Sequence, residues 1–339
     1  MELVKAVCLF SGGLDSILAV KILESQGVEV LAVQFVSPFF GSDYLKAPAS
    51  LIQEVWDKWK IHLQVVDLTR EYIPMLKNPP HGYGKNFNPC IDCKILMVRK
   101  AGEIMREMGA DFVATGEVVG QRPMSQRRDT MRIVERESGI EGYLLRPLSA
   151  KLLPETHPER EGWVKRDRLF ALSGRGRIPQ MELARFFGIE DYPSPAGGCV
   201  LTDPLLSKRI EYVVKTQPVV EVEDIFLCHV GRHFVWEGDM HLVVARNQGE
   251  NERLAALARE GDCFLKAVGF SGPTGLLRGL QKEWPRSRLR TAAGIVARYG
   301  KGRHETAVDV SVRRVGAEDV TILSVAPLWD IDGLGCKRL

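Results

Sequence analysis

The sequence predicts an α/β protein in which an open, mostly parallel sheet is followed by a smaller α+β domain. Strand-like and helix-like segments alternate up to about Leu148, which is typical of a parallel sheet built from β-α-β units. Short strand-like runs, interrupted by a helix, make up the last part of the chain. The length of 339 residues fits two domains.

The beginning of the chain is a β-α-β unit. The apolar run Leu3–Phe10 predicts a buried strand, a helix begins near Ile17 and ends near Gly27, and Val28–Val36 is the next strand. Two strands joined by a helix imply a parallel pair with a right-handed crossover.

Further α/β units follow in order. We expect a helix over Ala49–Lys60, a strand over Ile61–Val66, a helix over Cys93–Met108 and a short buried strand over Asp111–Thr115. This alternation places helices on both faces of an open sheet.

The alternation fades after Leu148. Residues 150–177 are rich in charge, Pro and Gly and should contain a helix and a long loop, and Ile178–Gly188 is helical again. A loop over Tyr192–Gly198 then leads to Cys199. We place the domain boundary within 205–215, which gives domains at 1–205 and 216–339.

The second domain should be α+β. A helix is expected over Glu250–Arg259. The expected strands are Asp224–His229, His233–Glu237, His241–Ala245, Val308–Val312 and Val320–Val325.

Composition is that of an ordinary globular protein, with 45% hydrophobic and 26% charged residues and a net charge of +3. It argues against a disordered or collagenous chain. No run approaches the ~20 apolar residues of a membrane span, and the N-terminus lacks the pattern of a signal peptide. We therefore expect a cytoplasmic protein with no membrane association.

The hexapeptide Ser11-Gly12-Gly13-Leu14-Asp15-Ser16 stands where the first strand ends and the first helix begins. Glycines there let backbone N–H groups converge on an anion, and the helix N-terminus adds a partial positive charge. The Ser11 and Ser16 hydroxyls can donate to phosphate oxygens, and Asp15 fits beside a phosphate through Mg²⁺. A glycine turn with helix-capping Ser and Asp is the alternative.

In this β-loop-α-β context the motif resembles the pyrophosphate loop of the PP-loop ATP pyrophosphatase superfamily, with its adenine nucleotide alpha hydrolase-like fold. The resemblance implies that ATP binds with Mg²⁺ and is cleaved to AMP and pyrophosphate while a carbonyl-type oxygen is adenylated. It also implies a nucleotide pocket. Its residues would be Ser11, Gly12, Gly13, Asp15 and Ser16 at the phosphates, Val33 and Phe35 at the adenine, and Thr115, Gly116 and Gln121 at the sheet edge.

Seven cysteines, an odd number, make a poor disulfide framework. Cys90 and Cys93 form a C-x-x-C pair at the N-terminal end of a predicted helix. Two thiols at such a place can bind a metal or cluster, form a redox disulfide or hold a low-pKa thiolate. Cys199 follows a Pro-Ala-Gly-Gly run that suits bringing one thiol to a distant site, although a small buried hydrophobe is the alternative. Three Cys ligands would leave one iron of a cubane cluster open, and an open iron can bind hydrosulfide.

These segments resemble the tRNA thiouridine synthases. Asn88-Pro89-x-x-x-Cys93 is similar to the N-P-D-x-x-C element of the 2-thiouridine synthases, with Cys90 in place of Asp. The stretch from Gly116 to Gln126, followed by Leu145-Arg146-Pro147-Leu148, resembles a signature of the 4-thiouridine synthases, and the three cysteines resemble their iron–sulfur-dependent versions. The resemblance covers roughly the first predicted domain. It implies a tRNA sulfurtransferase with Asp15, Cys93 and Cys199 catalytic and a 4Fe-4S cluster on Cys90, Cys93 and Cys199.

Two departures bear on the sulfur source. The 4-thiouridine synthases carry an RNA-binding THUMP region before the PP-loop, whereas here the loop begins almost at residue 1, and a rhodanese-like domain is not recognised either. Both favour sulfide, cluster-bound or free, or a cysteine desulfurase-type donor. A persulfide route through Cys93 and Cys199 stays open, as do the choice between uridine O2 and O4 and assembly as a homodimer.

The second predicted domain carries signs of RNA binding. Between Arg278 and Arg303, eight basic residues stand against one acid, and Trp284 and Tyr299 lie among them. This pattern suits contact with a phosphate backbone plus stacking on bases, with a solvated helix face as the alternative. Val243–Leu254 with Gly272-Pro273-Thr274 resembles the RNA-binding module of NFACT-type proteins.

Two competing interpretations remain. One is a PP-loop amide-forming ligase with a structural zinc, which iron plus acid-labile sulfide would exclude. The other is a non-catalytic RNA-binding protein with a vestigial nucleotide fold, which release of pyrophosphate from ATP with tRNA would exclude.

Overall fold

The computed structural model describes residues 3–194, 198–236, 240–279, 284–331 and 333–339. The chain divides into two compact units, Met1–Thr202 (unit 1) and Asp203–Leu339 (unit 2). The expected loop over Tyr192–Gly198 falls partly outside the described residues, as does Glu237 at the end of an expected strand.

Unit 1 alternates strands and helices as the sequence predicts. Its elements are β1 (Lys5–Leu9), α1 (Leu14–Glu24), β2 (Glu29–Val36), η1 (Ser42–Tyr44), α2 (Pro48–Trp59), β3 (Leu63–Asp67), α3 (Thr69–Lys77), α4 (Cys90–Met108), β4 (Phe112–Thr115), α5 (Arg128–Glu137), β5 (Leu144–Leu145), η2 (Ala150–Leu152), α6 (His157–Arg160), η3 (Arg166–Arg168), α7 (Ile178–Phe186) and η4 (Val200–Thr202). All the strands join one parallel sheet in the order β3-β2-β1-β4-β5.

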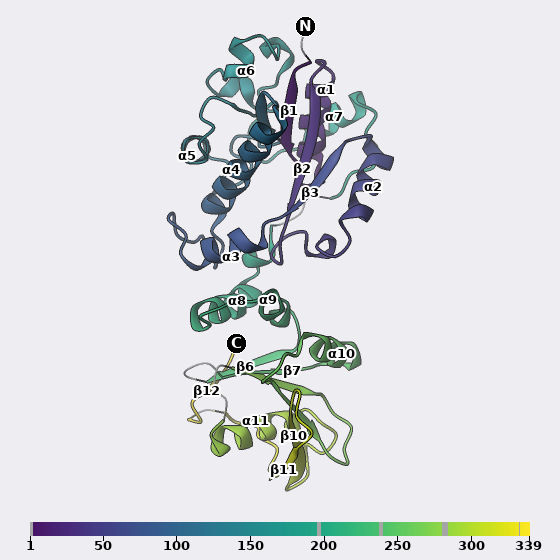
Figure 1. Ribbon diagram of the computed structural model, residues 1–339, viewed down its shortest axis with the longest axis vertical. Helices are drawn as coiled ribbons and strands as arrows, with labels where there is room; N and C mark the ends of the chain where they lie inside the picture. Colours follow the sequence, from purple (N-terminus) through teal and green to yellow (C-terminus); the bar gives the residue numbers. More distant parts are fainter. Residues whose placement is uncertain (1–2, 195–197, 237–239, 280–283, 332) are drawn as a thin grey trace. The chain divides into compact units, whose positions relative to one another are not determined.

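The central strand β1 explains why helices cover both faces of this sheet. Successive side chains of a strand point to opposite faces. Ala6 and Cys8 pack into a core with α1, α2 and α7, whereas Val7 and Leu9 pack into a core with α4 and α5 (Figure 1). An apolar strand buried on both faces is typical of parallel sheets, so the α/β prediction is confirmed.

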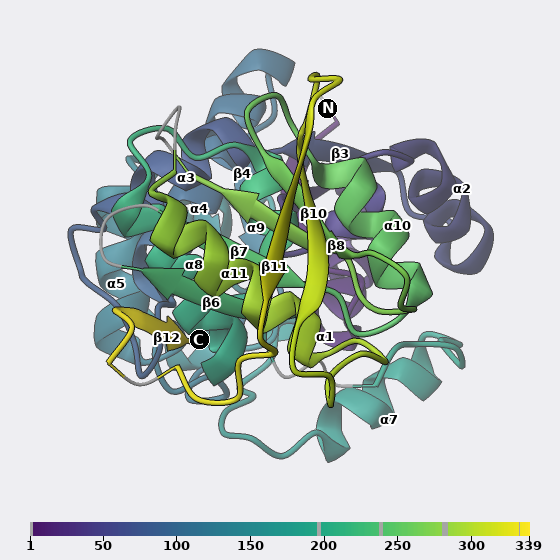
Figure 2. The ribbon, with the colours of Figure 1, turned by 90° about the horizontal axis from the view of Figure 1, so that it is seen from below.

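Unit 2 is built on a seven-stranded antiparallel sheet in the order β11-β10-β8-β9-β7-β6-β12. Its elements are α8 (Pro204–Thr216), α9 (Val222–Cys228), β6 (Arg232–Trp236), β7 (His241–Val244), α10 (Gln248–Leu257), β8 (Cys263–Ala267), β9 (Gly275–Arg278), α11 (Arg286–Arg298), β10 (Val308–Arg314), β11 (Val320–Val325) and β12 (Cys336–Arg338). β10 and β11 form a long hairpin (Figure 2), and α11 packs through Val296 into the same core as Leu265 and Val310 of the sheet.

One of the strands predicted for the second domain is a helix in the structure. Asp224–His229 lies mostly in the helix α9, because Glu221 and Asp224 form a capping box in which each side chain accepts from the other's backbone N–H. A short apolar run does not by itself distinguish a strand from a buried helix, and here the cap decides.

No helix in the described part of the chain combines the length and the apolar character needed to span a membrane.

Candidate functional site

The segments singled out by sequence meet at the carboxyl edge of the parallel sheet. Ser11–Ser16 follows β1, and Gly116–Gln121 follows β4. The helix α4 runs back toward the start of β4, so its first residues, Cys90 and Cys93, lie at the same edge. This is the edge at which open α/β sheets bind ligands.

The loop Ser11–Ser16 has the shape of an anion cradle. The Ser16 hydroxyl donates to the carbonyl of Gly13 at 2.7 Å and accepts from the backbone N–H of Ser11 at 3.2 Å, so the loop is closed by its own serine. Gly12 has a positive φ of 72°, and a Cβ there would meet nothing within 4 Å. The glycine therefore serves the backbone conformation and leaves open space in front of the N-terminus of α1.

Asp15 lies between a neutral donor and a cation. Its Oδ2 accepts from Gln121 Nε2 at 2.6 Å, and Arg177 Nη2 lies 3.7 Å from the same oxygen. Gln180 of α7 in turn donates to Gln121 Oε1 at 3.3 Å. The other oxygen of Asp15, Oδ1, is buried and has no hydrogen-bond partner among the described residues. A buried, unpartnered carboxylate oxygen beside an anion cradle fits a Mg²⁺ ligand.

Gly116 fixes how closely the end of β4 approaches the cradle. A Cβ at this position would lie 2.4 Å from the carbonyl oxygen of Asp15, so only glycine fits. The backbones of the two predicted pocket segments are therefore in direct contact.

The predicted adenine residues lie on β2 next to the end of β1. The register of these strands ends with the pair Leu9–Val33, after which the Phe10 N–H donates to the Val33 carbonyl at 2.8 Å. In a parallel strand alternate residues direct their N–H and C=O to the same side. The backbone N–H and C=O of Phe35 therefore point in the same direction as those of Val33. They lie beyond the last residue pair of β1 and β2, where the edge of an adenine ring can form hydrogen bonds with them.

Glu117 joins the cradle to the cysteine helix. It is buried, Arg146 Nε donates to its Oε2 at 3.2 Å, and Lys94 Nζ lies 3.6 Å from its Oε1. Burial alone would raise the pKa of Glu117, but Lys94 and Arg146 outweigh it and hold the pKa below its ordinary value. This carboxylate stays charged at neutral pH.

The three predicted thiols gather around Tyr72 of α3. The Tyr72 hydroxyl donates to the Cys93 sulfur, and burial, together with the nearby Cys93, Cys199 and Cys90, raises the pKa of Tyr72 well above its ordinary value. Tyr72 is 1% exposed, and its ring packs 4.9 Å from that of Phe39. Burial raises the pKa of Cys93 to about 12 against the opposing effect of the Tyr72 hydrogen bond, so an unliganded Cys93 is a thiol at neutral pH.

Hydrogen bonds bring the segment around Cys199 to the other two cysteines. Val200 N–H donates to the Phe39 carbonyl at 3.3 Å, and Asn86 Nδ2 donates to the Thr202 carbonyl at 2.8 Å. Asn88 in turn directs its Nδ2 to the Cys90 sulfur at 3.1 Å. One short loop, 86–90, therefore contacts both cysteine segments.

The three thiols are a set of possible metal ligands, but they do not form a preformed metal site. Among the described residues no group of three or more His, Cys, Asp or Glu is arranged to hold a metal ion. Cys90, Cys93 and Cys199 are free thiols in this structure, and they are the residues here that could hold a metal ion or a cluster.

Sequence patterns did not reveal Tyr72, Arg177 or Gln180. Tyr72 and the α7 residues reach the site only through the fold, from helices on opposite faces of the sheet. Lys94 could have been noticed, because it directly follows Cys93.

The basic segment of unit 2 is partly structural. Arg278 is 1% exposed and bonds Asp224 and Asp262, and Trp284 is 8% exposed within the core. The prediction that these two residues face RNA is therefore wrong. Tyr299, in contrast, is half-buried and lies beneath Arg232 and Arg298.

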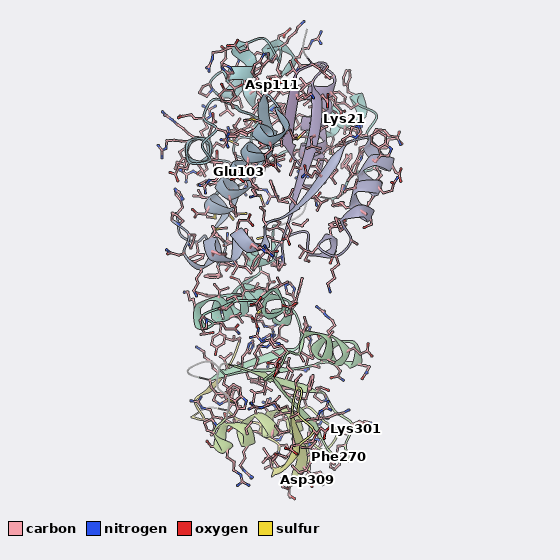
Figure 3. The ribbon with its side chains drawn as sticks, in the orientation of Figure 1. Lys21, Glu103, Asp111, Phe270, Lys301 and Asp309 are labelled. Atoms are coloured by element: carbon pink, nitrogen blue, oxygen red, sulfur yellow. The ribbon has the colours of Figure 1, made fainter. Side chains whose placement is uncertain are left out.

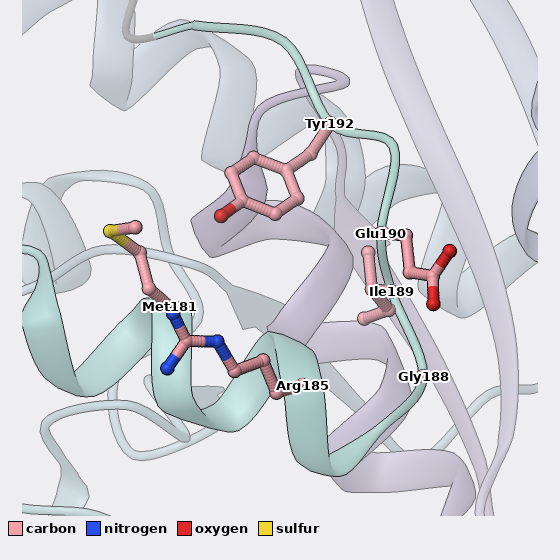
Figure 4. Close-up of a pocket in the computed structure, with 6 residues that line it drawn as sticks. All are labelled: Met181, Arg185, Gly188, Ile189, Glu190 and Tyr192. Carbon is pink, nitrogen blue, oxygen red and sulfur yellow. The ribbon is translucent and has the colours of Figure 1, made fainter.

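A hollow of about 320 Å³ lies at the end of α7 (Figure 4). Its lining includes Met181, Arg185 and Tyr192 but none of the cradle or cysteine residues. It is separate from the candidate site.

A parallel sheet with the Ser-Gly-Gly-x-Asp-Ser cradle after its first strand places unit 1 in the class of PP-loop adenine nucleotide-binding domains. Residues 3–151 match the family described as thiamine biosynthesis protein (ThiI), and residues 231–332 match the family described as NFACT protein RNA binding domain. The chain thus combines a region similar to the ThiI family with a C-terminal region similar to the NFACT RNA binding domain.

Two of the curated relatives match parts of this chain. A protein described as "Probable tRNA sulfurtransferase" from Thermococcus kodakarensis is 32% identical over 152 residues, which cover 42% of this chain and 36% of that protein. A "tRNA-specific 2-thiouridylase MnmA" from a Nitratiruptor species is 28% identical over 251 residues, or 72% of this chain and 68% of that one. The chain spans little more than a third of the Thermococcus protein's length.

Among solved structures, the "U34-tRNA thiolase NcsA" from Methanococcus maripaludis, described with its 4Fe-4S cluster, is 16% identical. The match covers 67% of this chain and 71% of that one with a TM-score of 0.34. A likeness this low supports no statement about function.

Proposed function

We propose that this protein is an ATP-dependent tRNA sulfurtransferase that replaces a uridine carbonyl oxygen with sulfur. One observation carries the proposal: the thiols and the anion cradle are physically connected. Cys93 adjoins Lys94, Lys94 lies against Glu117, and Glu117 follows Gly116, whose backbone contacts that of Asp15. A sulfur donor and an activated nucleotide would therefore meet at one edge of the sheet.

ATP binds at the cradle. Backbone N–H groups of Gly12 and Gly13 with the hydroxyl of Ser11 receive the pyrophosphate portion, Ser16 holds the loop closed, and the free Oδ1 of Asp15 would hold Mg²⁺. The Phe35 backbone receives the adenine. Thr115, Gly116 and Gln121 close the pocket, with Gln121 fixing the orientation of Asp15.

The proposed reaction consists of two successive displacement steps. A uracil carbonyl oxygen attacks the α-phosphorus of ATP, a new P–O bond forms and pyrophosphate leaves with its electron pair. Sulfide then attacks the activated uracil carbon, the C–O bond breaks and AMP leaves. The chain contributes positioning and charge stabilisation at the phosphates. Since a base must reach the pocket, the target uridine is unpaired or flipped out.

Cys90, Cys93 and Cys199 are the residues that would hold a 4Fe-4S cluster. With three protein ligands such a cluster supplies one open iron that can bind sulfide. The Tyr72 hydroxyl and the Asn88 amide hold the sulfurs of Cys93 and Cys90 in place. Sulfide itself or a cysteine desulfurase-type donor is the sulfur source in this proposal, the RNA is held by unit 2, and the reaction takes place in the cytoplasm.

The test separates activation from sulfur transfer. Anaerobically purified protein is incubated with ATP, tRNA and sulfide, and pyrophosphate and thiouridine are measured. Cys199→Ala should keep pyrophosphate release and lose thiouridine, whereas Cys336→Ala, a buried thiol of unit 2, should keep both. Zinc in place of iron and labile sulfide would favour an amide-forming ligase, and absence of RNA-dependent pyrophosphate release would refute the proposal.

A further inference from the structure

Five side chains of unit 2 form a ladder of alternating cations and rings. The Arg232 guanidinium lies 4.5 Å from the centre of the Tyr299 ring. Arg298 lies between two rings, 5.3 Å from Tyr299 and 5.2 Å from Trp329. His304 continues the series, with its ring nearly parallel to that of Trp329 and 6.2 Å between the centroids.

The outer end of this ladder faces solvent. Trp329 is 55% exposed, whereas Trp236 and Trp284 of the same unit are 3% and 8% exposed. Arg298 also donates from Nη1 to the Trp329 carbonyl at 2.9 Å, which fixes the residue that carries the ring. A large exposed ring whose position is fixed by a neighbouring cation is unlike the scattered apolar residues of an ordinary surface.

The turn beside the ladder is held in shape and carries positive charge. The Lys301 N–H donates to the Ser271 carbonyl at 2.8 Å, and Phe270, 36% exposed, lies so close to Gly302 that a Cβ there would be 2.9 Å from its ring. Figure 3 labels Lys301 and Phe270 in this part of unit 2. Arg303 Nε donates to His304 Nε2 at 3.1 Å and so orients the imidazole. Lys301 and Arg303 are exposed, with Glu305 and Asp330 as the neighbouring acids in sequence.

We propose that the exposed end of this ladder, Trp329 with His304, backed by Arg298, stacks on an unpaired nucleobase of RNA. This inference rests on the proposed RNA substrate and names the surface and the RNA feature that it recognises. An indole that is open to solvent and backed by a guanidinium binds the π-face of any base, while Lys301 and Arg303 attract the backbone phosphates. Duplex bases are already stacked, so the surface selects loops or single-stranded ends.

The test compares single-stranded with duplex RNA. Binding of the full-length chain to a fluorescent single-stranded RNA 12-mer and to its blunt duplex is measured at several salt concentrations. Trp329→Ala should weaken single-strand binding about fivefold to a hundredfold, the usual range for loss of one stacked base, and leave the salt dependence unchanged. Trp329→Phe should restore most of the affinity, and duplex binding should change little.

The matched control is Trp56→Ala in unit 1. Trp56 is 39% exposed with Lys60 Nζ 5.5 Å from its ring, so it is also an exposed tryptophan beside a cation, but outside the proposed surface. Its removal should leave RNA binding unchanged. Equal affinity of Trp329→Ala and the wild type for single strands, or an equal loss for single strands and duplex, would overturn the inference. Failure of the sulfurtransferase proposal appears separately, as tight RNA binding by the wild type without thiouridine formation.

Discussion

Lys94 Nζ lies 3.6 Å from Glu117 Oε1, so the residue after Cys93 touches the turn that follows β4. The two groups come from elements on different sides of the nucleotide pocket, and Arg146 holds the other oxygen of the same carboxylate. This pair links the thiols to the anion cradle, and its loss should separate the two halves of the site.

Replacing Glu117 by Gln should destabilise the protein at neutral pH and uncouple sulfur transfer from ATP cleavage. Arg146 and Lys94 would lose a charged partner, which costs about 2–3 kcal/mol. The pKa of Glu117 is lowered, so its contribution is fully present above the ordinary value of 4.5 and is lost as pH falls through the lower folded-state pKa. Urea unfolding should therefore show a difference between wild type and E117Q at neutral pH that shrinks below pH 4.5. A difference that is the same at both pH values would contradict this role.

Asp15→Asn should abolish most ATP cleavage. The amide cannot neutralise Mg²⁺, and its N–H groups would face the Nε2 donor of Gln121, now 2.6 Å from Asp15. We expect pyrophosphate release to fall about 10²–10³-fold, the usual effect of removing one charge-stabilising group. The measurement is pyrophosphate release over a range of Mg²⁺ concentrations. Asp43→Asn, on an exposed turn of the same unit, is the control, and an equal loss in both variants would exclude the proposed role.

The sequence predicts the parts of the site that are local in the chain. A strand, a glycine cradle and a helix follow one another, so their pattern is visible without the fold. The expected strand Asp224–His229 lies mostly in the helix α9, and the prediction is wrong because a segment of six residues carries too little periodicity to distinguish a strand from a helix. Tyr72 and Arg177 were missed because the side chains they contact, Cys93 and Asp15, are distant in sequence.

The charge of a residue likewise does not show from the sequence whether that residue is buried or exposed. Arg278 belongs to the basic run, yet its partners Asp262 and Asp224 stand 16 and 54 residues earlier. Trp284 carries an aromatic ring in the same run, but it packs into the core of unit 2 just before α11. Only the folded chain separates these structural residues from Arg298 and Trp329.

Arg278→Met should therefore destabilise unit 2 without changing how RNA binding depends on salt. Removal of the guanidinium leaves Asp262 and one oxygen of Asp224 buried without their cation, which costs about 3–5 kcal/mol. Arg286→Met, at an exposed position of the same run, should leave stability unchanged. Urea midpoints and salt-dependent RNA binding of the folded variants check both statements. An Arg278 variant of wild-type stability would show that the buried cluster contributes nothing.

The buried pair His233–His241 should make unit 2 sensitive to acid. His233 Nε2 donates to the Val230 carbonyl at 2.7 Å, so its Nδ1 accepts from His241 Nε2 at 2.8 Å, and both rings are neutral. Protonation of His233 Nδ1 would place two N–H groups against each other. Burial lowers the pKa of His241 to about 3 and that of His233 well below its ordinary value.

The direction in which stability changes with pH follows from proton uptake by the unfolded chain. Between pH 6.5 and about 3 the unfolded chain binds a proton at His241 that the folded chain does not, so stability falls as the pH falls. Each such histidine contributes about 1.4 kcal/mol per pH unit. His241→Gln should lower stability at neutral pH and reduce this slope by one proton. Urea unfolding can be followed by tryptophan emission in a background with Trp56, Trp59 and Trp163 replaced by Phe, so that the signal comes from unit 2. Equal slopes for the wild type and His241→Gln would show that the pair does not set the acid response.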